Sequence, residues 1–249
     1  DSFNTMASRL DSTEASRRRL LTDLAHEIRT PLASMEICVE SLEDGAIEPG
    51  PDAWHILTGQ IERISRLADD LGQVSAAEEG RLNLILETAD PAELAREAVL
   101  AADEGYGRKG VGLSVEPSAG LPTVRVDRAR IAQVLGNLLS NALRHTPRGG
   151  HVTVQVAADE AMVGIEVGDT GDGIAAEHLP HIFERFYRAD AARDRDSGGT
   201  GVGLAISRAI ALAHGGQLTA ISPGPGKGST FTLHLPEWSE PSSKQHRTG

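Results

Sequence analysis

The sequence predicts two domains, an all-α helical hairpin followed by an α+β sandwich. Its 249 residues exceed the need of one small module, since a domain averages roughly 150 residues. Residues 5–44 contain no Gly and carry apolar side chains spaced three and four apart, which is typical of an amphipathic helix. After Gly80 the pattern changes to alternation and short helical segments. This change indicates a second domain that contains a sheet.

The composition is that of an ordinary globular chain. With 39% hydrophobic and 24% charged residues, the chain can bury a core, which excludes wholesale disorder and collagen-like structure. The net charge of −12 argues against a broad surface for nucleic acid or anionic lipid. Cys38 is the single cysteine and lies in an apolar run, so we expect a buried thiol and a reducing compartment. No signal peptide or apolar run of about 18 residues is present, and the start at Asp1 suggests a piece of a longer protein.

Two helices joined by a short turn make up the expected hairpin. Turn residues at 43–51 separate residues 5–44 from a second helical pattern that runs to about residue 77. The apolar stripes consist of Leu21, Leu24, Ile28, Leu32, Met35, Val39 and Leu42 in the first arm, and of Leu57, Ile61, Ile64, Leu67, Ala68, Leu71 and Val74 in the second. Because a lone hairpin cannot bury both stripes, we expect a homodimeric four-helix bundle. The alternative is a monomer whose hairpin packs on its own C-terminal domain.

The second domain is expected to contain short strands and three helices. We expect a strand at 82–86, a helix from Pro91 to about Asp103 with Asp90 as N-cap, strands at 111–115 and 123–126, and a helix at 128–145. Paired strands near 151–158 and 162–168, a polar stretch to about 198, a helix at 200–214 and strands near 217–222 and 229–235 follow. The helices are expected on one face of the sheet.

His26 lies on the first helix in surroundings that suit a nucleophile. It is two residues from both Leu24 and Ile28, about 200° around the helix from each, and so points away from the apolar stripe. Glu27 can accept the imidazole proton or fix its tautomer, which leaves a ring nitrogen free to react. A zinc protease would need a second histidine where Thr30 stands. A surface histidine without a role is the other alternative.

The helix at 128–145 carries candidate ligands for a metal-bound phosphate. Asn137 and Asn141 are four residues apart and share a face, and Arg144 and His145 follow one turn later. Amide oxygens suit Mg²⁺ that already carries phosphate oxygens, and Arg144 adds a cationic contact. Ordinary surface asparagines are the alternative.

Two glycine motifs complete the candidate site. Asp169, Gly171 and Gly173 follow an apolar strand, where a carboxylate can accept a hydrogen bond from an exocyclic amine such as that of adenine. A plain Asp-Gly turn is the alternative. The glycine-rich run at 198–204 precedes a helix and can offer N–H groups to phosphate. Its spacing is not that of the dinucleotide-binding fingerprint, and the Lys227 segment lacks the Ser/Thr and the helix of a Walker loop.

The polar residues between these motifs are expected to form a lid over a ligand. Arg188 would bring positive charge to a terminal phosphate when that lid closes.

In this order the motifs resemble the cytoplasmic kinase core of a two-component sensor histidine kinase. HEIRTPL at 26–32 is similar to the H box, NLLSNALRHT at 137–146 to the N box, DTGDGI at 169–174 to the G1 box, FERFYR at 183–188 to the F box, GGTGVGLAI at 198–206 to the G2 box and GKGSTFTLHLP at 226–236 to the closing strand. The resemblance covers about residues 8–236.

This resemblance implies a hairpin for dimerisation and histidine phosphotransfer, followed by an ATP-binding domain of the Bergerat type, also called GHKL and shared with gyrase and MutL. It implies His26 as phospho-acceptor, Glu27 as its acid/base partner, and Thr30 as the residue that positions water during dephosphorylation of the partner. The implied ATP site consists of Asn137 and Arg144 at the phosphates, Asn141 as the Mg²⁺ ligand, His145 near the nucleotide, Asp169 at adenine with Gly171 and Gly173 shaping the pocket, and Arg188, Gly199, Thr200, Gly201, Val202, Gly203 and Leu204 at the phosphates. Val202 stands where the family commonly has Leu, which is a conservative change.

The expected domain organisation follows the same resemblance. Residues 1–11 resemble the end of an upstream HAMP signalling helix, 12–78 form the dimerisation and phosphotransfer domain, 79–90 the linker, 91–238 the catalytic ATP-binding domain and 239–249 a disordered tail.

The expected function is ATP-dependent autophosphorylation of His26 and phosphotransfer to an aspartate in the receiver domain of a response regulator, together with phosphatase activity on that regulator. The alternatives are a catalytically silent scaffold and a protein dominated by the phosphatase activity. A gyrase-like ATPase would have Glu in place of Asn137. We expect a cytoplasmic portion of a sensor in the inner or plasma membrane, with no nucleic-acid partner and with membrane contact only through an absent upstream region.

Overall fold

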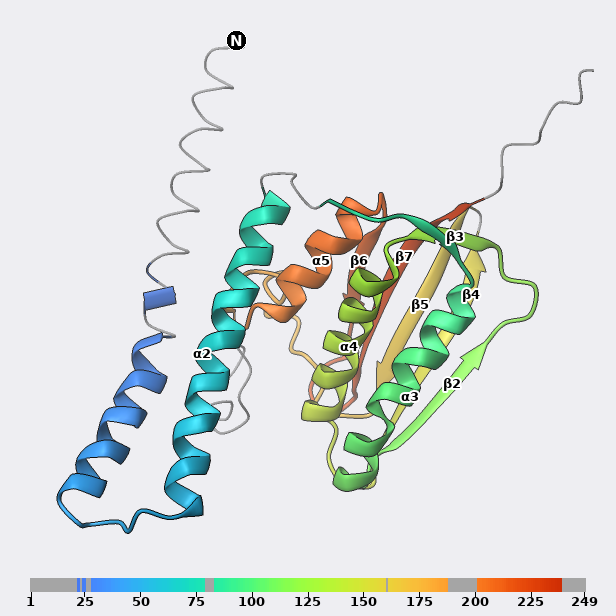
Figure 1. Cartoon of the computed structure of the whole chain (residues 1–249). Helices are drawn as coiled ribbons and strands as arrows, with labels where there is room; N and C mark the ends of the chain where they lie inside the picture. The colour runs from blue at the N-terminus through green and yellow to red at the C-terminus, as the bar shows by residue number, and fades with distance from the viewer. Residues whose placement is uncertain are drawn as a thin grey trace, which may run out of the picture. The chain divides into compact units, whose positions relative to one another are not determined.

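A computed structural model describes residues 22, 24–25, 28–78, 83–159, 161–187 and 201–238 of the chain. The chain divides into two compact units, one built mainly of residues 1–73 and the other mainly of residues 74–189 and 203–249. The first unit is helical and the second contains the sheet (Figure 1). In the described part, no helix combines the length and the apolar character that crossing a membrane requires.

The first unit is the predicted helical hairpin. Residues 28–43 are helical, and helix α2 (Pro51–Glu78) runs back beside them after a turn. The two arms touch near the turn, where the buried Sγ of Cys38 lies 3.9 Å from the main-chain oxygen of Ala53. This contact confirms Cys38 as a buried, free thiol.

Part of the predicted apolar stripe stays exposed on the single chain. Leu32 is 44% exposed, Val39 42% and Ile61 52%, although all three belong to the stripe. Leu32 and Val39 are seven residues apart and so lie on one side of the first arm, where exposed apolar side chains favour a protein partner. The homodimer stays a prediction.

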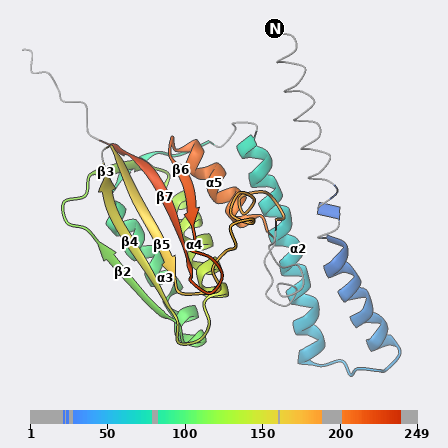
Figure 2. The ribbon, with the colours of Figure 1, turned by 180° about the vertical axis from the view of Figure 1, so that it is seen from behind.

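The second unit is a sheet covered on one face by three helices (Figure 1 and, from behind, Figure 2). The strands are β1 (Glu87–Ala89), β2 (Gly112–Pro117), β3 (Thr123–Val126), β4 (His151–Asp159), β5 (Met162–Asp169), β6 (Gln217–Ile221) and β7 (Ser229–Trp238), and the helices are α3 (Pro91–Lys109), α4 (Arg128–His145) and α5 (Gly203–Ala213). The strand order is β1-β3-β7-β5-β4-β2, with β6 also paired to β7. The described pairs are antiparallel apart from β2 with β4.

Alternation along the strands explains the two-layer packing. In β4 the side chains of Val152, Val154 and Val156 are at most 1% exposed, whereas Gln155 between them is exposed. Successive strand residues point to opposite faces, so the valines face the helical layer. The predicted α+β sandwich with helices on one face is confirmed.

Local capping sets the starts of α3 and α4. Asp90 accepts a hydrogen bond from the N–H of Ala92, and Pro91 occupies the first helical position, as predicted. Asp127 caps α4 in the same way through the N–H of Arg130. The predicted bounds of α4 are confirmed.

Three sequence-based boundaries are wrong. No strand forms over residues 83–86, the described part of the strand expected at 82–86; the short β1 follows at 87–89, and the apolar Ile85 before it is 80% exposed. Helix α3 continues to Lys109 instead of ending near residue 103, and the buried Tyr106, whose hydroxyl bonds to the main-chain oxygen of Leu139 in α4, favours the helix despite Gly105 and Gly107. Helix α5 begins at Gly203 rather than at residue 200.

Candidate active site

The predicted site residues of the second unit come from the second half of α4, the loop after β5 and the start of α5. The structure describes Thr30 on the hairpin and Asn137, Asn141, Arg144, His145, Asp169, Gly171, Gly173, Gly201, Val202, Gly203 and Leu204. The other predicted residues, His26, Glu27, Arg188, Gly199 and Thr200, lie outside the described residues. The roles of all of these residues are predictions.

A main-chain hydrogen bond joins the end of α4 to the loop after β5. The N–H of Asp172 donates to the main-chain oxygen of His145 at 3.1 Å. At Gly171 a Cβ atom would collide with that same oxygen of His145 and would lie 2.9 Å from Oδ1 of Asp169. Gly171 is therefore the residue that lets the two segments approach this closely.

Asp169, at the end of β5, is held by two donors. Its Oδ1 accepts a hydrogen bond from the N–H of Gly171 at 2.8 Å, and its Oδ2 accepts one from the hydroxyl of Ser229 at 2.5 Å. Each carboxylate oxygen has two lone pairs, so the group can still accept a hydrogen bond from a ligand. Ser229 was missed by the sequence analysis. Only strand pairing identifies Ser229, because β7 pairs with β5 in a register that sets Ser229 opposite Asp169.

The loop between β6 and β7 bonds to the loop after β5, which begins at Asp169 and is called the Asp169 loop below. The N–H of Gly226 donates to the main-chain oxygen of Asp172 at 2.6 Å, and that of Gly228 donates to Gly171 at 3.1 Å. Gly173 has a φ of 66°, and a side chain there would collide with the main chain of Gly224. Glycines on both loops thus allow main chain to pack directly on main chain.

Asn137 links α4 to the first turn of α5. Its Nδ2 donates to the main-chain oxygen of Gly203 at 3.2 Å and to the hydroxyl of Ser207 at 3.3 Å. Asn141, half-buried and four residues after Asn137 on the same face of α4, carries an amide oxygen of the type that can act as a Mg²⁺ ligand. Just before α5, Gly201 takes a φ of 71°, a conformation that favours glycine.

The buried Tyr106 of α3 lies under this region. Its hydroxyl donates to the main-chain oxygen of Leu139 in α4 at 2.8 Å. Burial, and secondly the negative charge of Asp169, raise the pKa of Tyr106 above its ordinary value. Tyr106 is therefore a neutral hydrogen-bond donor and was not identified from the sequence.

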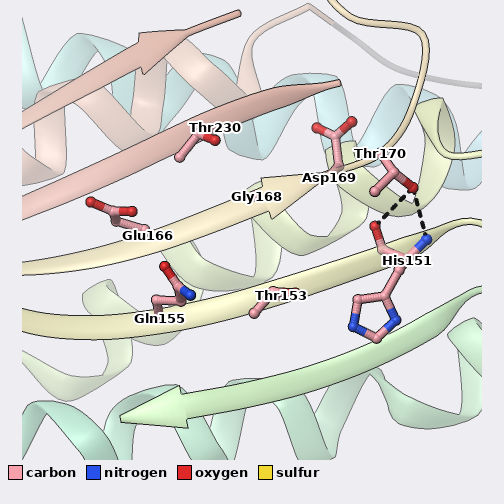
Figure 3. A pocket seen from close by; sticks show the side chains of 8 residues that line it. All are labelled: His151, Thr153, Gln155, Glu166, Gly168, Asp169, Thr170 and Thr230. Carbon is pink, nitrogen blue, oxygen red and sulfur yellow. Dashed lines mark hydrogen bonds between the residues drawn. The ribbon is translucent and has the colours of Figure 1, made fainter. Parts of the chain in front are cut away.

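The face of the sheet that the helices leave open carries a depression, which is separate from the contacts described above (Figure 3). It is lined by His151, Thr153, Gln155, Glu166, Gly168, Asp169, Thr170 and Thr230. The hydroxyl of Thr170 contacts both the N–H and the main-chain oxygen of His151 there. Asp169 is the single predicted site residue among these eight, so the depression does not coincide with the predicted nucleotide site.

Family models match both units of the chain. Residues 16–80 match the His Kinase A (phospho-acceptor) domain, and residues 126–239 match the Histidine kinase-, DNA gyrase B-, and HSP90-like ATPase. These two matches correspond in order to the hairpin and to the sheet-containing unit.

Relatives and solved structures agree with the family models. The chain is 35% identical to the signal transduction histidine-protein kinase BaeS of Escherichia coli over 94% of this chain and 50% of BaeS. It is 37% identical to the sensor histidine kinase WalK of Bacillus subtilis over 91% of this chain and 38% of WalK. The chain therefore spans half or less of the length of these curated relatives.

Among solved structures, the histidine kinase AdeS of Acinetobacter baumannii superposes with a TM-score of 0.72 at 26% identity, covering 86% of this chain and 98% of that one. Full-length ShkA in complex with AMPPNP superposes with a TM-score of 0.65 at 27% identity, covering 89% of this chain and 46% of that one. Both the expected fold and the expected family are confirmed. The chain belongs to the sensor histidine kinases of two-component systems and contains the helical phospho-acceptor hairpin and the GHKL-type ATPase domain of their core.

Proposed function

We propose that this chain transfers the γ-phosphoryl group of ATP to His26 and then to an aspartate in the receiver domain of a response regulator. The observation that carries the proposal is the junction of three motif segments in the second unit. The N–H of Asp172 bonds to His145, which joins α4 to the Asp169 loop, and the amide of Asn137 joins α4 to the start of α5. Catalysis of phosphoryl transfer depends mainly on positioning and charge neutralisation, and such a junction supports a fixed nucleotide site.

The described residues fit an adenine nucleotide with Mg²⁺. The carboxylate of Asp169 can still accept a hydrogen bond from the exocyclic amine of adenine. Gly171 and Gly173 carry no side chains, so neighbouring main chain packs closely against their loop. Asn141 would hold Mg²⁺, and Arg144 would contact phosphate. When bound, Mg²⁺ would neutralise negative charge on the phosphates. The solved complex of ShkA with AMPPNP supports a nucleotide in this type of domain.

The proposed transfer forms one bond and breaks one. A ring nitrogen of His26 bonds to the γ-phosphorus while the bond from that phosphorus to the bridging oxygen breaks, and ADP leaves. Glu27 accepts the remaining imidazole proton, and the carboxylate of the regulator's aspartate then takes the phosphoryl group. Because His26 and Asp169 belong to different units, the transfer requires His26 of one unit to reach the γ-phosphate bound by the other.

We also propose that the hairpin forms the homodimer. The exposed stripe residues Leu32, Val39 and Ile61 supply an apolar surface that a second copy would cover. A cytoplasmic position within a membrane-bound sensor is a proposal that rests on the resemblance alone.

The test is incubation with γ-labelled ATP and Mg²⁺, beside the variant His26→Gln. We expect label on the wild type that survives base and is lost in acid, as a phosphoramidate requires, and no label on the variant. A matched control is His55→Gln, which changes an exposed histidine of α2. If the wild type binds ATP but takes up no label, autophosphorylation is excluded, and the phosphatase and scaffold alternatives are left.

A phosphatase activity on the regulator is the second candidate. Thr30 is exposed on the helical arm and lies one turn after the H-box histidine in sequence. If its hydroxyl positions the attacking water, Thr30→Ala slows decay of labelled regulator and leaves labelling of His26 intact. Equal decay with both proteins would exclude this role for Thr30.

A further inference from the structure

We propose that Lys109 is a positioning residue for the ATP site, which it serves by capping the end of α4. This inference rests on the proposed function, because the affected side chains are those assigned to nucleotide and Mg²⁺. Neither family model that matches the chain includes Lys109, since the second match begins at residue 126.

The carbonyl groups at the end of α4 need hydrogen-bond donors from outside the helix. The last four carbonyl groups of an α-helix have no partner inside the helix. In α4 they belong to Ala142, Leu143, Arg144 and His145. The N–H of Thr146 donates to Ala142 at 3.0 Å, and the N–H of Asp172 donates to His145 at 3.1 Å. Leu143 and Arg144 are left, and Pro147 has no N–H that could serve Leu143.

Lys109 satisfies both of these carbonyl groups. Its Nζ donates to the main-chain oxygen of Leu143 at 2.5 Å and to that of Arg144 at 2.9 Å. A cation at this end of a helix is also favoured by the helix dipole. The C-terminal end of α4 is therefore closed by an ammonium group from α3 together with the Asp172 N–H of the Asp169 loop.

The main chain around Lys109 is itself fixed. Gly110, in the left-handed conformation at φ 72°, ends α3 and donates its N–H to Tyr106 and Gly107. The carbonyl of Gly110 accepts a hydrogen bond from the N–H of Gly149, in the loop after α4, at 2.8 Å. The ends of the two helices are thus tied together beside the ammonium group.

Tyr106 provides a second attachment one turn earlier on α3. It is 1% exposed, and its hydroxyl bonds to the main-chain oxygen of Leu139. Tyr106 and Lys109 therefore bind α4 at two points one helical turn apart, Tyr106 at Leu139 and Lys109 at Leu143. This arrangement determines how far the last turn of α4, with Asn141, Arg144 and His145, extends toward the Asp169 loop.

Loss of the ammonium group would act on ATP through these side chains. With the carbonyl groups of Leu143 and Arg144 unpaired, the last turn of α4 gains freedom to fray. Asn141 and Arg144 would then be held less firmly where metal and phosphate are proposed to bind. The expected consequence is weaker ATP binding, with a smaller effect on the rate of the chemical step.

The experiment compares Lys109→Met, Lys109→Arg and Arg108→Met in the full chain. Each variant is measured for affinity for ATP with Mg²⁺, for KM and kcat of autophosphorylation, and for thermal unfolding. We expect Lys109→Met to weaken ATP affinity and raise KM about tenfold, which corresponds to about 1.4 kcal/mol. Lys109→Arg, which keeps a cationic donor, should restore most of the affinity. Arg108→Met should behave as the wild type, because Arg108 is an exposed neighbour that pairs with Glu104 at 3.9 Å.

The outcomes separate this inference from the proposed function. If the wild type binds no ATP, the proposed function fails. If the wild type binds ATP and Lys109→Met binds it equally well while its unfolding temperature falls, Lys109 is merely a stabilising cap and the inference is overturned. Should Lys109→Met not fold, Lys109→Gln replaces it, because its shorter and uncharged side chain weakens the cap on Leu143 and Arg144, and an affinity equal to that of the wild type overturns the inference.

Discussion

The hydroxyl of Ser229 donates a hydrogen bond to Oδ2 of Asp169 at 2.5 Å, although the two residues are 60 positions apart in the chain. The N–H of Gly171 binds the other carboxylate oxygen. Together these donors set the orientation of the carboxylate that is proposed to recognise adenine. A serine with no predicted role is thereby connected to the proposed nucleotide site.

Ser229→Ala is predicted to raise KM for ATP about tenfold with a smaller change in kcat, because the orientation of Asp169 is lost while the transferring groups are untouched. Autophosphorylation kinetics at varied ATP provide the measurement. Thr230→Ala is the matched control, since successive strand residues point to opposite faces and Thr230 lines the open face of the sheet. An unchanged KM in Ser229→Ala would contradict the assigned orientation.

Gly171→Ala is predicted to lower the free energy of unfolding by about 1–3 kcal/mol and to abolish ATP binding. Its methyl group would meet the main chain of His145, which cannot move away as a flexible side chain could. Gly136→Ala in α4 is the control, because a Cβ atom there has nothing within 4 Å. The control should gain about 1 kcal/mol from helix propensity. Thermal unfolding of both variants is the measurement, and equal shifts would show that the contact at Gly171 is unimportant.

Asp127 is predicted to make the stability of the second unit depend on acid pH. Burial alone would raise the pKa of Asp127, but hydrogen bonds from the N–H groups of Ile85 and Arg130 and the nearby charge of Arg130 hold it below its usual value. A carboxyl with a lowered folded-state pKa stabilises the fold while it is ionised. This contribution is complete well above the ordinary Asp pKa of about 3.9 and is lost as the pH falls through the lower folded-state value.

The measurement is urea unfolding of the wild type and Asp127→Asn between neutral and acid pH. Asn can still cap α4, yet it lacks the charge and one of the two acceptor oxygens. The variant should be less stable at neutral pH, and its free energy of unfolding should change less on acidification. Asp90→Asn, which alters the N-cap of α3, is the control. Parallel pH profiles for wild type and Asp127→Asn would rule out Asp127 as the source.

Val39→Glu is predicted to weaken dimerisation, because a charge on the exposed apolar stripe must be buried when a second copy covers it. Sedimentation equilibrium of the variant beside the wild type measures the change. Ile37→Glu is the control, since Ile37 is 63% exposed and lies about 160° around the helix from Val39. A monomeric wild type, or equal effects of both substitutions, would refute the stripe as the dimer interface.

Much of the fold follows from local patterns in the sequence. Helix α4 has its predicted bounds, because Asp127 caps its start and its apolar spacing is regular. Strands β4 and β5 follow from alternation between the two faces of the sheet. The segments that carry the predicted ATP site are also recognisable from their motifs, although the roles of their residues stay predictions.

Only the tertiary structure decided where these segments are supported and how far some of them extend. Ser229 and Lys109 bear no local signal, because their partners are 60 and 34–35 positions away. Helix α3 continues past Gly105 and Gly107, whose low helix propensity favours an earlier end, because the buried Tyr106 between them is fixed to Leu139 of α4. The sequence by itself therefore determined the order of elements and motifs, which depends on neighbours within a turn or a strand. Strand register and helix packing determined the groups that hold the candidate site in place.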